Sequence, residues 1–152
     1  LPYIFFNENS SVLPGRYKRL TATERLNFRQ ESLERLRPID VYYTTLNIIG
    51  KRMESNPAAV LFLTGCNSNT ATEQGNQRLS EQRAQAISDY LQDIWKIPAK
   101  RIIIQKRDLP EKPSLASALL SDEEAMAENR RVELSSTSPD ILAPVSLTTM
   151  QL

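Results

Sequence analysis

The sequence predicts a two-layer α/β (α+β) sandwich, in which a mixed sheet of about four strands carries its helices on one face. Short apolar runs without polar alternation recur along the chain, as is typical of strands that are covered by helices or lie at the centre of a sheet. Two longer stretches between these runs place apolar side chains at helical spacing. The 152 residues are enough for one domain with a single hydrophobic core.

The first predicted strand is the aromatic run Tyr3–Phe6, and the basic stretch over residues 14–38 predicts one helix behind it. Thr23 is the expected cap of this helix. The apolar positions of the helix are Leu26, Phe28, Leu33 and Leu36. Two interpretations of the stretch stay open: a solvated, charge-laced helix with a linker, or a docking surface for an acidic partner or another domain.

A second helix, of about fourteen residues, is predicted before Asn56-Pro57, since a proline disfavours helical backbone at the residue that precedes it. Its apolar stripe consists of Tyr42, Leu46, Ile49 and Met53. Gly50 lies inside this helix and costs roughly 1 kcal/mol relative to alanine. Close packing on the sheet would explain a glycine at this position.

The apolar run Ala59–Thr64 predicts a central strand, and the small, polar residues of Gly65–Gly75 predict a surface loop behind it. A long helix follows from about Asn76 to Trp95. The apolar run Arg101–Gln105 predicts the third strand.

The remainder of the chain predicts one more strand, Arg131–Leu134, which alternates between polar and apolar residues. Lys106–Glu128 contains two prolines and predicts a long surface connection with room for a short helix over Leu115–Leu120. Residues 137–152 predict a tail or linker. The expected order of the strands and the two main helices is therefore strand–helix–strand–helix–strand–strand.

Arg83 is the unusual residue of the long helix, because it shares one helical face with apolar side chains. These are Leu79, Ala86, Tyr90 and Ile94. An isolated buried charge is very costly, so Arg83 either has an internal carboxylate or carbonyl partner or lines a pocket for an anionic ligand. In a third interpretation, its stem covers the core and its charged head stays in water. Its position after a strand and a loop favours the ligand, because sites in α/β proteins gather at the carboxyl ends of strands.

Two motifs link this helix to the last strand. They are Asn76-x-x-Leu79-Ser80-x-x-Arg83-Ala84, which begins eleven residues after Gly65, and Asn129-Arg130-Arg131-Val132-Glu133. In combination they resemble the OmpA-like domain, a family that includes the C-terminal domain of the outer-membrane protein A porins, the peptidoglycan-associated lipoproteins and the flagellar stator wall anchors. The resemblance implies an OmpA-like domain over residues 1–136, with residues 14–38 as a basic insertion.

The resemblance also implies a ligand site, because family members clamp the diaminopimelate of the peptidoglycan stem peptide between an Arg and an Asp. The Arg position matches Arg83, whereas the Asp position falls on Ser68. A neutral hydroxyl then replaces the carboxylate that holds the ammonium of the ligand, and this loss is expected to cost about 2–5 kcal/mol of binding. The other expected site residues are Asn67, Asn76, Leu79, Ser80, Arg130 and Arg131.

The composition argues against several other classes of function. The chain has no histidine and therefore lacks the commonest general base and metal ligand, so we expect no enzyme, no metal and no cofactor. The single Cys66 is expected to be a partly buried thiol rather than a nucleophile. A net charge of +1 argues against nucleic acid as a partner, and no apolar run is long enough to span a bilayer.

The expected function is that of a non-catalytic cell-envelope module that anchors a larger protein to the cell wall through the diaminopimelate of the stem peptide. The alternative is a protein-interaction or scaffold module of a large envelope protein that has lost peptidoglycan binding. By the resemblance, its location is the periplasm, in association with the outer membrane, and its other partners are further domains or envelope proteins. The chain starts at Leu1-Pro2 without a signal peptide, so we expect it to be an excised domain of a longer protein.

Overall fold

Four strands form one mixed sheet in the computed structural model, which describes residues 2–145 apart from the side chains of Ser32 and Glu34. The strands are β1 (Tyr3–Phe5), β2 (Leu61–Gly65), β3 (Ile102–Lys106) and β4 (Arg131–Ser136), in the spatial order β1-β4-β2-β3. β2 and β3 are parallel, and β4 runs antiparallel to both β1 and β2. The predicted four-strand mixed sheet is confirmed, and each predicted strand lies within two residues of the observed one at both ends.

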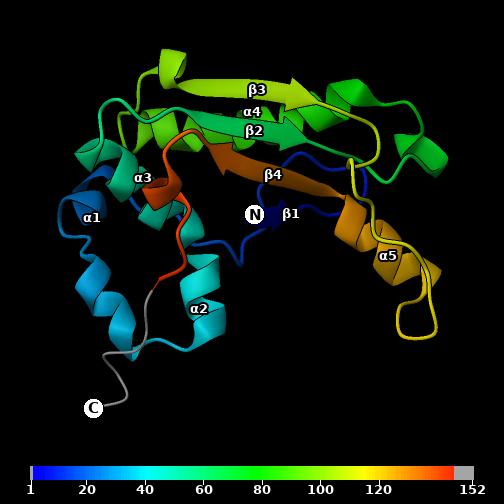
Figure 1. Ribbon diagram of the computed structural model, residues 1–152, viewed down its shortest axis with the longest axis horizontal. Helices are drawn as coiled ribbons and strands as arrows, with labels where there is room; N and C mark the ends of the chain where they lie inside the picture. Colours follow the sequence, from blue (N-terminus) through cyan, green and yellow to red (C-terminus); the bar gives the residue numbers. More distant parts are fainter. Residues whose placement is uncertain (1, 146–152) are drawn as a thin grey trace.

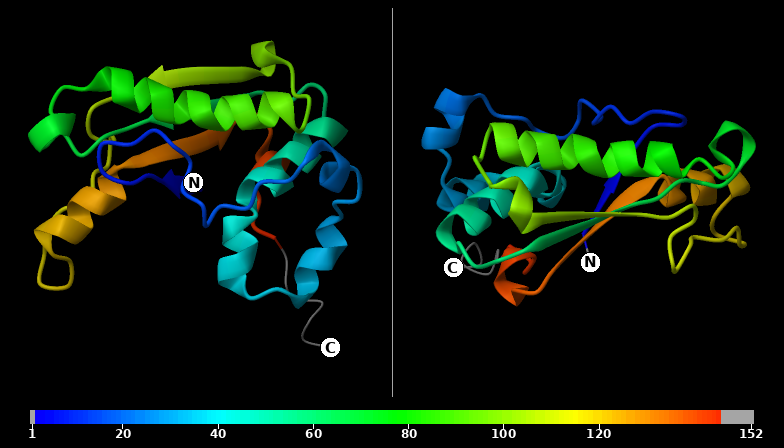
Figure 2. Two further views of the ribbon diagram at one scale, coloured as in Figure 1. Left: turned by 180° about the vertical axis from the view of Figure 1, so that it is seen from behind. Right: turned by 90° about the horizontal axis from the view of Figure 1, so that it is seen from above.

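The helices cover one face of this sheet and its two ends (Figures 1 and 2). The α-helices of the described residues are α1 (Ala22–Leu26), α2 (Pro38–Tyr43), α3 (Thr45–Ser55), α4 (Gln77–Asp93) and α5 (Asp122–Asn129). Short 3-10 helices are η1 (Gln30–Arg35), η2 (Ala71–Glu73), η3 (Ala99–Arg101) and η4 (Pro139–Ile141). α4 lies along the strands, α1 to α3 gather at one end of the sheet, and α5 lies at the other end (Figure 1). Within residues 2–145 no helix is long and apolar enough to cross a membrane.

The hydrophobic core lies between the sheet and the two longest helices, α3 and α4. Burial alternates along β2, where Leu61 and Leu63 face the helices and Phe62 is only half-buried on the other face. The buried apolar residues of α4 are Leu79, Ala84, Ile87 and Leu91. The stripe predicted for this helix is therefore rotated: Leu79 and Arg83 are buried, whereas Ala86, Tyr90 and Ile94 are half-buried at the edge of the core.

The basic stretch over residues 14–38 differs from the prediction of one helix. It forms the short helices α1 and η1, and α1 begins at a capping box of Thr21 and Glu24 rather than at Thr23. The next predicted helix is divided at Thr44 into α2 and α3. The positions of these short helices test neither of the two interpretations of the basic stretch.

Two glycines permit the close approaches that position α4. A Cβ atom at Gly50 would lie 2.3 Å from Cγ of Trp95, so the partner that requires this glycine is the indole at the end of α4 and not the sheet. A Cβ atom at Gly65 would lie 1.8 Å from the carbonyl oxygen of Ser80. The end of β2 therefore touches the backbone of the first turn of α4, and the loop between them lies against the start of that helix.

The connection between β3 and β4 contains α5, which the sequence analysis did not predict. The predicted short helix over Leu115–Leu120 is absent from this described segment, and Leu119 is 95% exposed there. α5 begins at Ser121, whose side chain and that of Glu124 form a capping box. This motif was present in the sequence and would have located the helix.

The predicted tail partly packs on the domain. Ile141 of η4 is buried in the core, and Arg52 of α3 donates hydrogen bonds to the carbonyl oxygens of Ile141 and Ala143 at 3.2 and 2.6 Å. The packed chain therefore extends to at least residue 143, and residues 146–152 of the predicted tail lie outside the described residues.

Candidate functional site

The loop after β2 is tied to the first turn of α4 by two asparagines. Asn76 caps the helix, because its side-chain oxygen accepts the backbone N–H of Leu79 at 3.1 Å. The fully buried amide of Asn67 donates to the carbonyl oxygen of Asn76 at 3.1 Å and to Oγ of Ser80 at 3.0 Å. A third contact joins this amide to Oδ1 of Asp108 after β3, at 3.2 Å. Both asparagines thus position the loop and the helix relative to each other.

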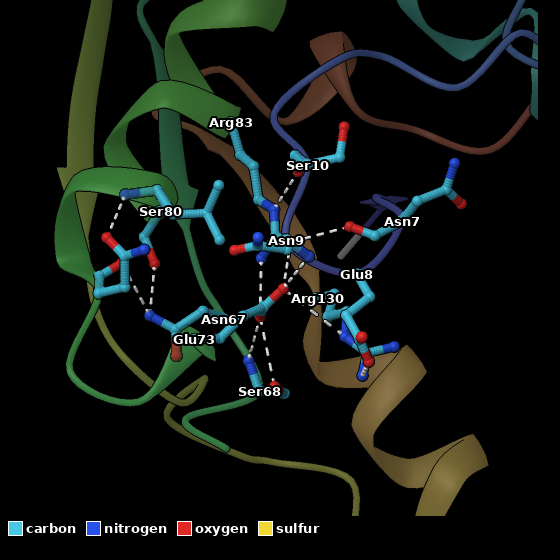
Figure 3. Close-up of polar contacts among 12 residues, drawn as sticks. Asn7, Glu8, Asn9, Ser10, Asn67, Ser68, Glu73, Ser80, Arg83 and Arg130 are labelled. Atoms are coloured by element: carbon cyan, nitrogen blue, oxygen red, sulfur yellow. Dashed lines mark hydrogen bonds and ion pairs between the residues drawn. The ribbon is translucent and has the colours of Figure 1, made fainter. Parts of the chain in front are cut away.

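Arg83 points from α4 into this junction and is 0% exposed (Figure 3). Its Nε donates to the carbonyl oxygen of Ser10 at 2.8 Å, Nη1 to that of Cys66 at 3.0 Å, and Nη2 to that of Asn7 at 3.0 Å. The two remaining hydrogen bonds go to the carboxylate of Glu73, at 2.7 Å from Nη2 and 3.3 Å from Nη1. A guanidinium has five N–H groups, so each can be assigned one internal acceptor.

Glu73 is the internal partner of Arg83 and is itself only 1% exposed. Besides Arg83, its carboxylate accepts the backbone N–H of Asn9 at 2.6 Å and that of Ser68 at 2.9 Å. Burial alone would raise the pKa of Glu73, but the hydrogen bonds from Arg83 and from these two N–H groups outweigh it and hold the pKa below its ordinary value. The pair is therefore an ionised, buried salt bridge at neutral pH.

The sequence left three interpretations of Arg83 open, and the structure agrees with the first of them, an internal carboxylate or carbonyl partner. The expectation that its head is reachable by solvent or by an anion is wrong for this structure, because Glu73 and three carbonyl oxygens surround the guanidinium. Whether Arg83 binds a ligand once Glu73 has moved is not tested by this geometry.

Ser68, at the position of the family Asp, lies directly beside the Arg83–Glu73 pair and is buried. Its hydroxyl donates to the carboxylate of Glu73 at 3.3 Å and shares a hydrogen bond of 2.8 Å with Thr70. Leu79 and Ser80 are also buried at the same junction. These residues of the predicted site therefore lie together around the Arg83–Glu73 pair, and a carboxylate of the chain itself lies at the centre.

The two arginines of the second motif, Arg130 and Arg131, have different surroundings. Arg130 is 11% exposed and lies at the site, with Nη2 at 3.1 Å from Glu8 and Nε at 3.7 Å from Glu73 (Figure 3). This Nε is buried and has no hydrogen-bond partner among the described residues. Arg131 lies away from the site: its guanidinium stacks on the ring of Tyr3 at 4.1 Å and pairs with Glu133 at 2.8 Å. We therefore assign Arg131 a structural role in the sheet.

Two hollows flank the closed site, and neither has Arg83 in its lining. One, of about 410 Å³, lies between the end of β1 and the end of α5 and is lined in part by Phe5, Glu8 and Arg130. The other, of about 540 Å³, lies beside the start of α4 and is lined in part by Asn69 and Asp108. Neither hollow therefore opens directly onto the guanidinium of Arg83.

Solved structures of other proteins share this fold. The structure of the peptidoglycan-associated lipoprotein from Burkholderia pseudomallei matches with a TM-score of 0.55 and 20% identity over 90% of this chain and 91% of that chain. The C-terminal domain of Helicobacter pylori MotB matches with a TM-score of 0.54 and 16% identity over 99% of this chain and 97% of that chain. The OmpA-like domain of FopA1 from Francisella tularensis matches with a TM-score of 0.53 and 16% identity over 88% of this chain and 70% of that chain.

The sequence itself also identifies the family. No curated protein matches the chain. The family model of the OmpA family, however, matches residues 39–117, which is just over half of the 152 residues. This match includes the helix that carries Arg83 and the loop that carries Glu73. The chain belongs to the OmpA family.

Proposed function

We propose that this chain is a non-catalytic scaffold or protein-interaction module of a larger cell-envelope protein, in which the clamp for diaminopimelate is closed by the chain's own Glu73. One observation carries the proposal: the guanidinium of Arg83 is 0% exposed and all its hydrogen bonds end on acceptors of the same chain. A stem peptide could reach Arg83 only after displacing a buried carboxylate that five N–H or O–H donors hold.

Membership of the OmpA family and the shared fold support an envelope location, since the similar structures include a peptidoglycan-associated lipoprotein and a MotB domain. We place the module in the periplasm, in association with the outer membrane. Other domains or envelope proteins are its proposed partners, with peptidoglycan as a neighbouring structure rather than a tight ligand of the Arg83 site.

The burial of the single thiol supports the proposal that the chain is not catalytic. Cys66 is fully buried, and burial raises its pKa to about 12, so little thiolate forms at neutral pH. No histidine exists in the chain to activate Ser68 or Ser80.

The second candidate function is the wall anchor, and one specific observation favours it. Asn76, Leu79, Ser80 and Arg83 occupy the positions of the family motif and lie together at one junction. A clamp would then form if the segment with Glu73 swung outward. Rebuilding the clamp would need two changes, because an Asp at Ser68 alone would place a second carboxylate beside Glu73, whose Oε1 is 3.3 Å from the hydroxyl of Ser68. The change Ser68→Asp alone should therefore fail, whereas Ser68→Asp with Glu73→Ala should rebuild the clamp.

Cosedimentation with insoluble peptidoglycan that contains diaminopimelate separates the two candidates. The wild-type chain should stay in the supernatant, and the double variant Ser68→Asp/Glu73→Ala should sediment and be released by free diaminopimelate. The matched control is Glu81→Ala, which removes a half-exposed carboxylate paired with Lys106 at 3.2 Å. Sedimentation of the wild type, with release by diaminopimelate, would reject the scaffold and establish the anchor.

A further inference from the structure

The loop that leads from β3 to α5 displays two leucines at one end of the molecule (Figure 1). We call residues 113–121 the leucine loop. Ser117 and Leu120 exchange two backbone hydrogen bonds, at 2.8 and 3.4 Å, and these bonds close a tight turn that contains Leu119. Leu119 is 95% exposed and Leu115 is 72% exposed. A single exposed leucine needs no explanation, whereas two on one loop form an apolar surface that is suited to a partner.

The base of the leucine loop is fixed to the domain. The side-chain amide of the buried Asn129 accepts the backbone N–H of Ser114 at 2.8 Å and donates to the carbonyl oxygen of Ser114 at 3.0 Å. Arg131 of β4 donates to the carbonyl oxygen of Lys112, directly before the loop, at 3.0 Å. Hydrogen bonds therefore hold the loop at its base and at its turn. A loop that is already ordered loses little conformational freedom when it docks.

The two ends of the molecule carry opposite charge. Residues 111–129, which include most of the leucine loop and α5, contain five acidic residues and one basic residue, for a net charge of −4. Residues 14–38, which include α1 and η1, contain seven basic and three acidic residues, for a net charge of +4. These segments lie at opposite ends of the sheet (Figure 1). The acidic end of one copy is therefore complementary to the basic end of another.

An apolar hollow lies at the basic end. It has a volume of about 140 Å³ and lies between α2, α3 and residues 141–145, with Val41 and Leu142 in its lining. Arg52 also lines it and donates a hydrogen bond to the side chain of Gln30 in η1 at 3.3 Å, so the basic stretch borders the hollow. An apolar cavity of about 150 Å³ binds a molecule as large as benzene, so this hollow can hold one leucine side chain.

The two ends project on the same side of the sheet. The helices α1 and α2 at one end, and α5 with the leucine loop at the other, extend past β1 and away from β3 (Figures 1 and 2). A two-fold rotation between two copies therefore brings the leucine loop of each copy to the basic end of the other. Such a pair is closed, because both complementary surfaces of each copy are then used.

We propose that two copies of this chain form a two-fold dimer in which Leu119 of each copy enters the apolar hollow of the other. The acidic residues of α5 then face the basic residues of α1 and η1. Once one contact has formed, the second is intramolecular, so the two contacts reinforce each other. The dimer deepens the proposed function, because it names a second copy as the partner of the interaction module. It also gives residues 14–38 the role of a docking surface for an acidic partner.

Sedimentation velocity of the 152-residue chain over a concentration series tests the dimer. The wild type should approach twice the mass of a single chain, and sodium chloride should weaken the association because it screens the charges of the two ends. Leu119→Asp and Ala143→Glu should each weaken the dimer roughly 100-fold or more, since each places a carboxylate in both apolar contacts. Both positions are exposed, so the melting temperature of each variant should stay at the wild-type value.

Two matched controls place the same changes elsewhere on the surface. Val12→Asp replaces an apolar residue that is 72% exposed in the loop after β1, and Ala99→Glu changes an exposed alanine of η3. Neither residue lines the hollow or belongs to the leucine loop. Both controls should therefore keep the dissociation constant of the wild type.

A mixture of the two disruptive variants separates the reciprocal contact from any other. When Leu119→Asp pairs with Ala143→Glu, one contact keeps both wild-type partners: the leucine loop of the second variant and the hollow of the first. The mixture should therefore contain more dimer than either variant alone, as measured with a fluorescent label on one of them. An equal amount of dimer would overturn the reciprocal arrangement. A loss of dimer in Leu119→Asp without a loss in Ala143→Glu would overturn it too.

A wild type that remains monomeric up to about 1 mM would overturn the dimer. If a chain that ends at Val145 dimerises where the full chain does not, the hollow belongs to the chain's own residues 146–152, and the proposal is likewise lost. The proposed function fails on a different result, namely sedimentation of the wild type with peptidoglycan and its release by diaminopimelate. Each of the two proposals can therefore be lost while the other stands.

Discussion

Replacement of Arg83 by methionine should strongly destabilise the fold. Methionine fills much of the same volume, but it leaves the 1%-exposed Glu73 without its closest cation and the carbonyl oxygens of Asn7, Ser10 and Cys66 without a donor. Breaking a buried ion pair by removing one partner costs about 3–5 kcal/mol. For a chain of this size, that loss lowers the melting temperature by roughly 6–20 °C. Arg130, at 3.7 Å from Glu73, remains as a weaker partner and favours the lower part of this range.

A double-mutant cycle measured by urea denaturation gives the interaction energy between Arg83 and Glu73. Glu73→Leu alone should also cost several kcal/mol, because it leaves Arg83 buried and unneutralised. Arg83→Met/Glu73→Leu removes both charges, so its loss should fall short of the sum of the single losses by about 2 kcal/mol or more. Glu81→Ala is the surface control, and its cost should stay within about 1 kcal/mol because Glu81 is 52% exposed. A loss below about 1 kcal/mol in Arg83→Met, or simple additivity in the cycle, would refute the reasoning.

Two further predictions follow from the titratable groups of the site. The advantage in unfolding free energy of the wild type over Glu73→Gln should shrink in acid: the pKa of Glu73 is held below its ordinary 4.5, so its contribution is complete above that pH and is lost as the pH falls through the lower folded-state value. Urea denaturation of both chains between about pH 7 and about pH 3 checks this, and a constant difference would contradict it. Cys66, whose pKa burial raises to about 12, should react with a thiol reagent only after unfolding. Rapid modification of the native chain, followed by absorbance at neutral pH, would show that the thiol is accessible.

The sheet and the helix α4 were predictable because their signals are local and strong. The run Ala59–Thr64 has no polar residue before its end, and the helix behind it has both a capping asparagine, Asn76, and an apolar stripe. The burial of Arg83 followed from the same stripe. Only the centre of the buried face was displaced, toward Ile87 and Leu91, and α4 contacts β2, β3 and β4 of the sheet.

The short helices were mispredicted because local capping boxes, and not length or an apolar period, mark where they begin. α1 has five residues, none of them buried, and it depends on the capping box at Thr21. The single helix expected within residues 14–38, after a cap at Thr23, would have needed an unbroken apolar stripe, whereas Leu26 is exposed and Leu33 is buried. α5 has little amphipathic character, so its capping box at Ser121 was the available signal.

The spacing of residues in the sequence could not identify Glu73 as the partner of Arg83. Glu73 precedes Arg83 by ten residues in a polar loop, and no helical or strand period relates the two positions. Their contact depends on the positive φ of Asn69 and Ala71, which turns the loop back over the junction, and alanine carries no sequence signal for that conformation. The carbonyl oxygens of Asn7 and Ser10 are equally invisible in the sequence, since any residue would present the same backbone atom.

Arg83 joins three parts of the chain that are distant in sequence: the loop after β1 through Asn7 and Ser10, the loop after β2 through Cys66 and Glu73, and α4 itself. Three of its five hydrogen bonds end on backbone carbonyls, and these bonds would persist whichever carboxylate took the remaining two. The guanidinium is therefore positioned by the fold. Under the proposed function, the loop before α4 determines whether the carboxylate at this arginine comes from a ligand or from the chain. In this chain the loop supplies Glu73, and the identity of residue 73 therefore decides the state of the site more directly than the serine at position 68.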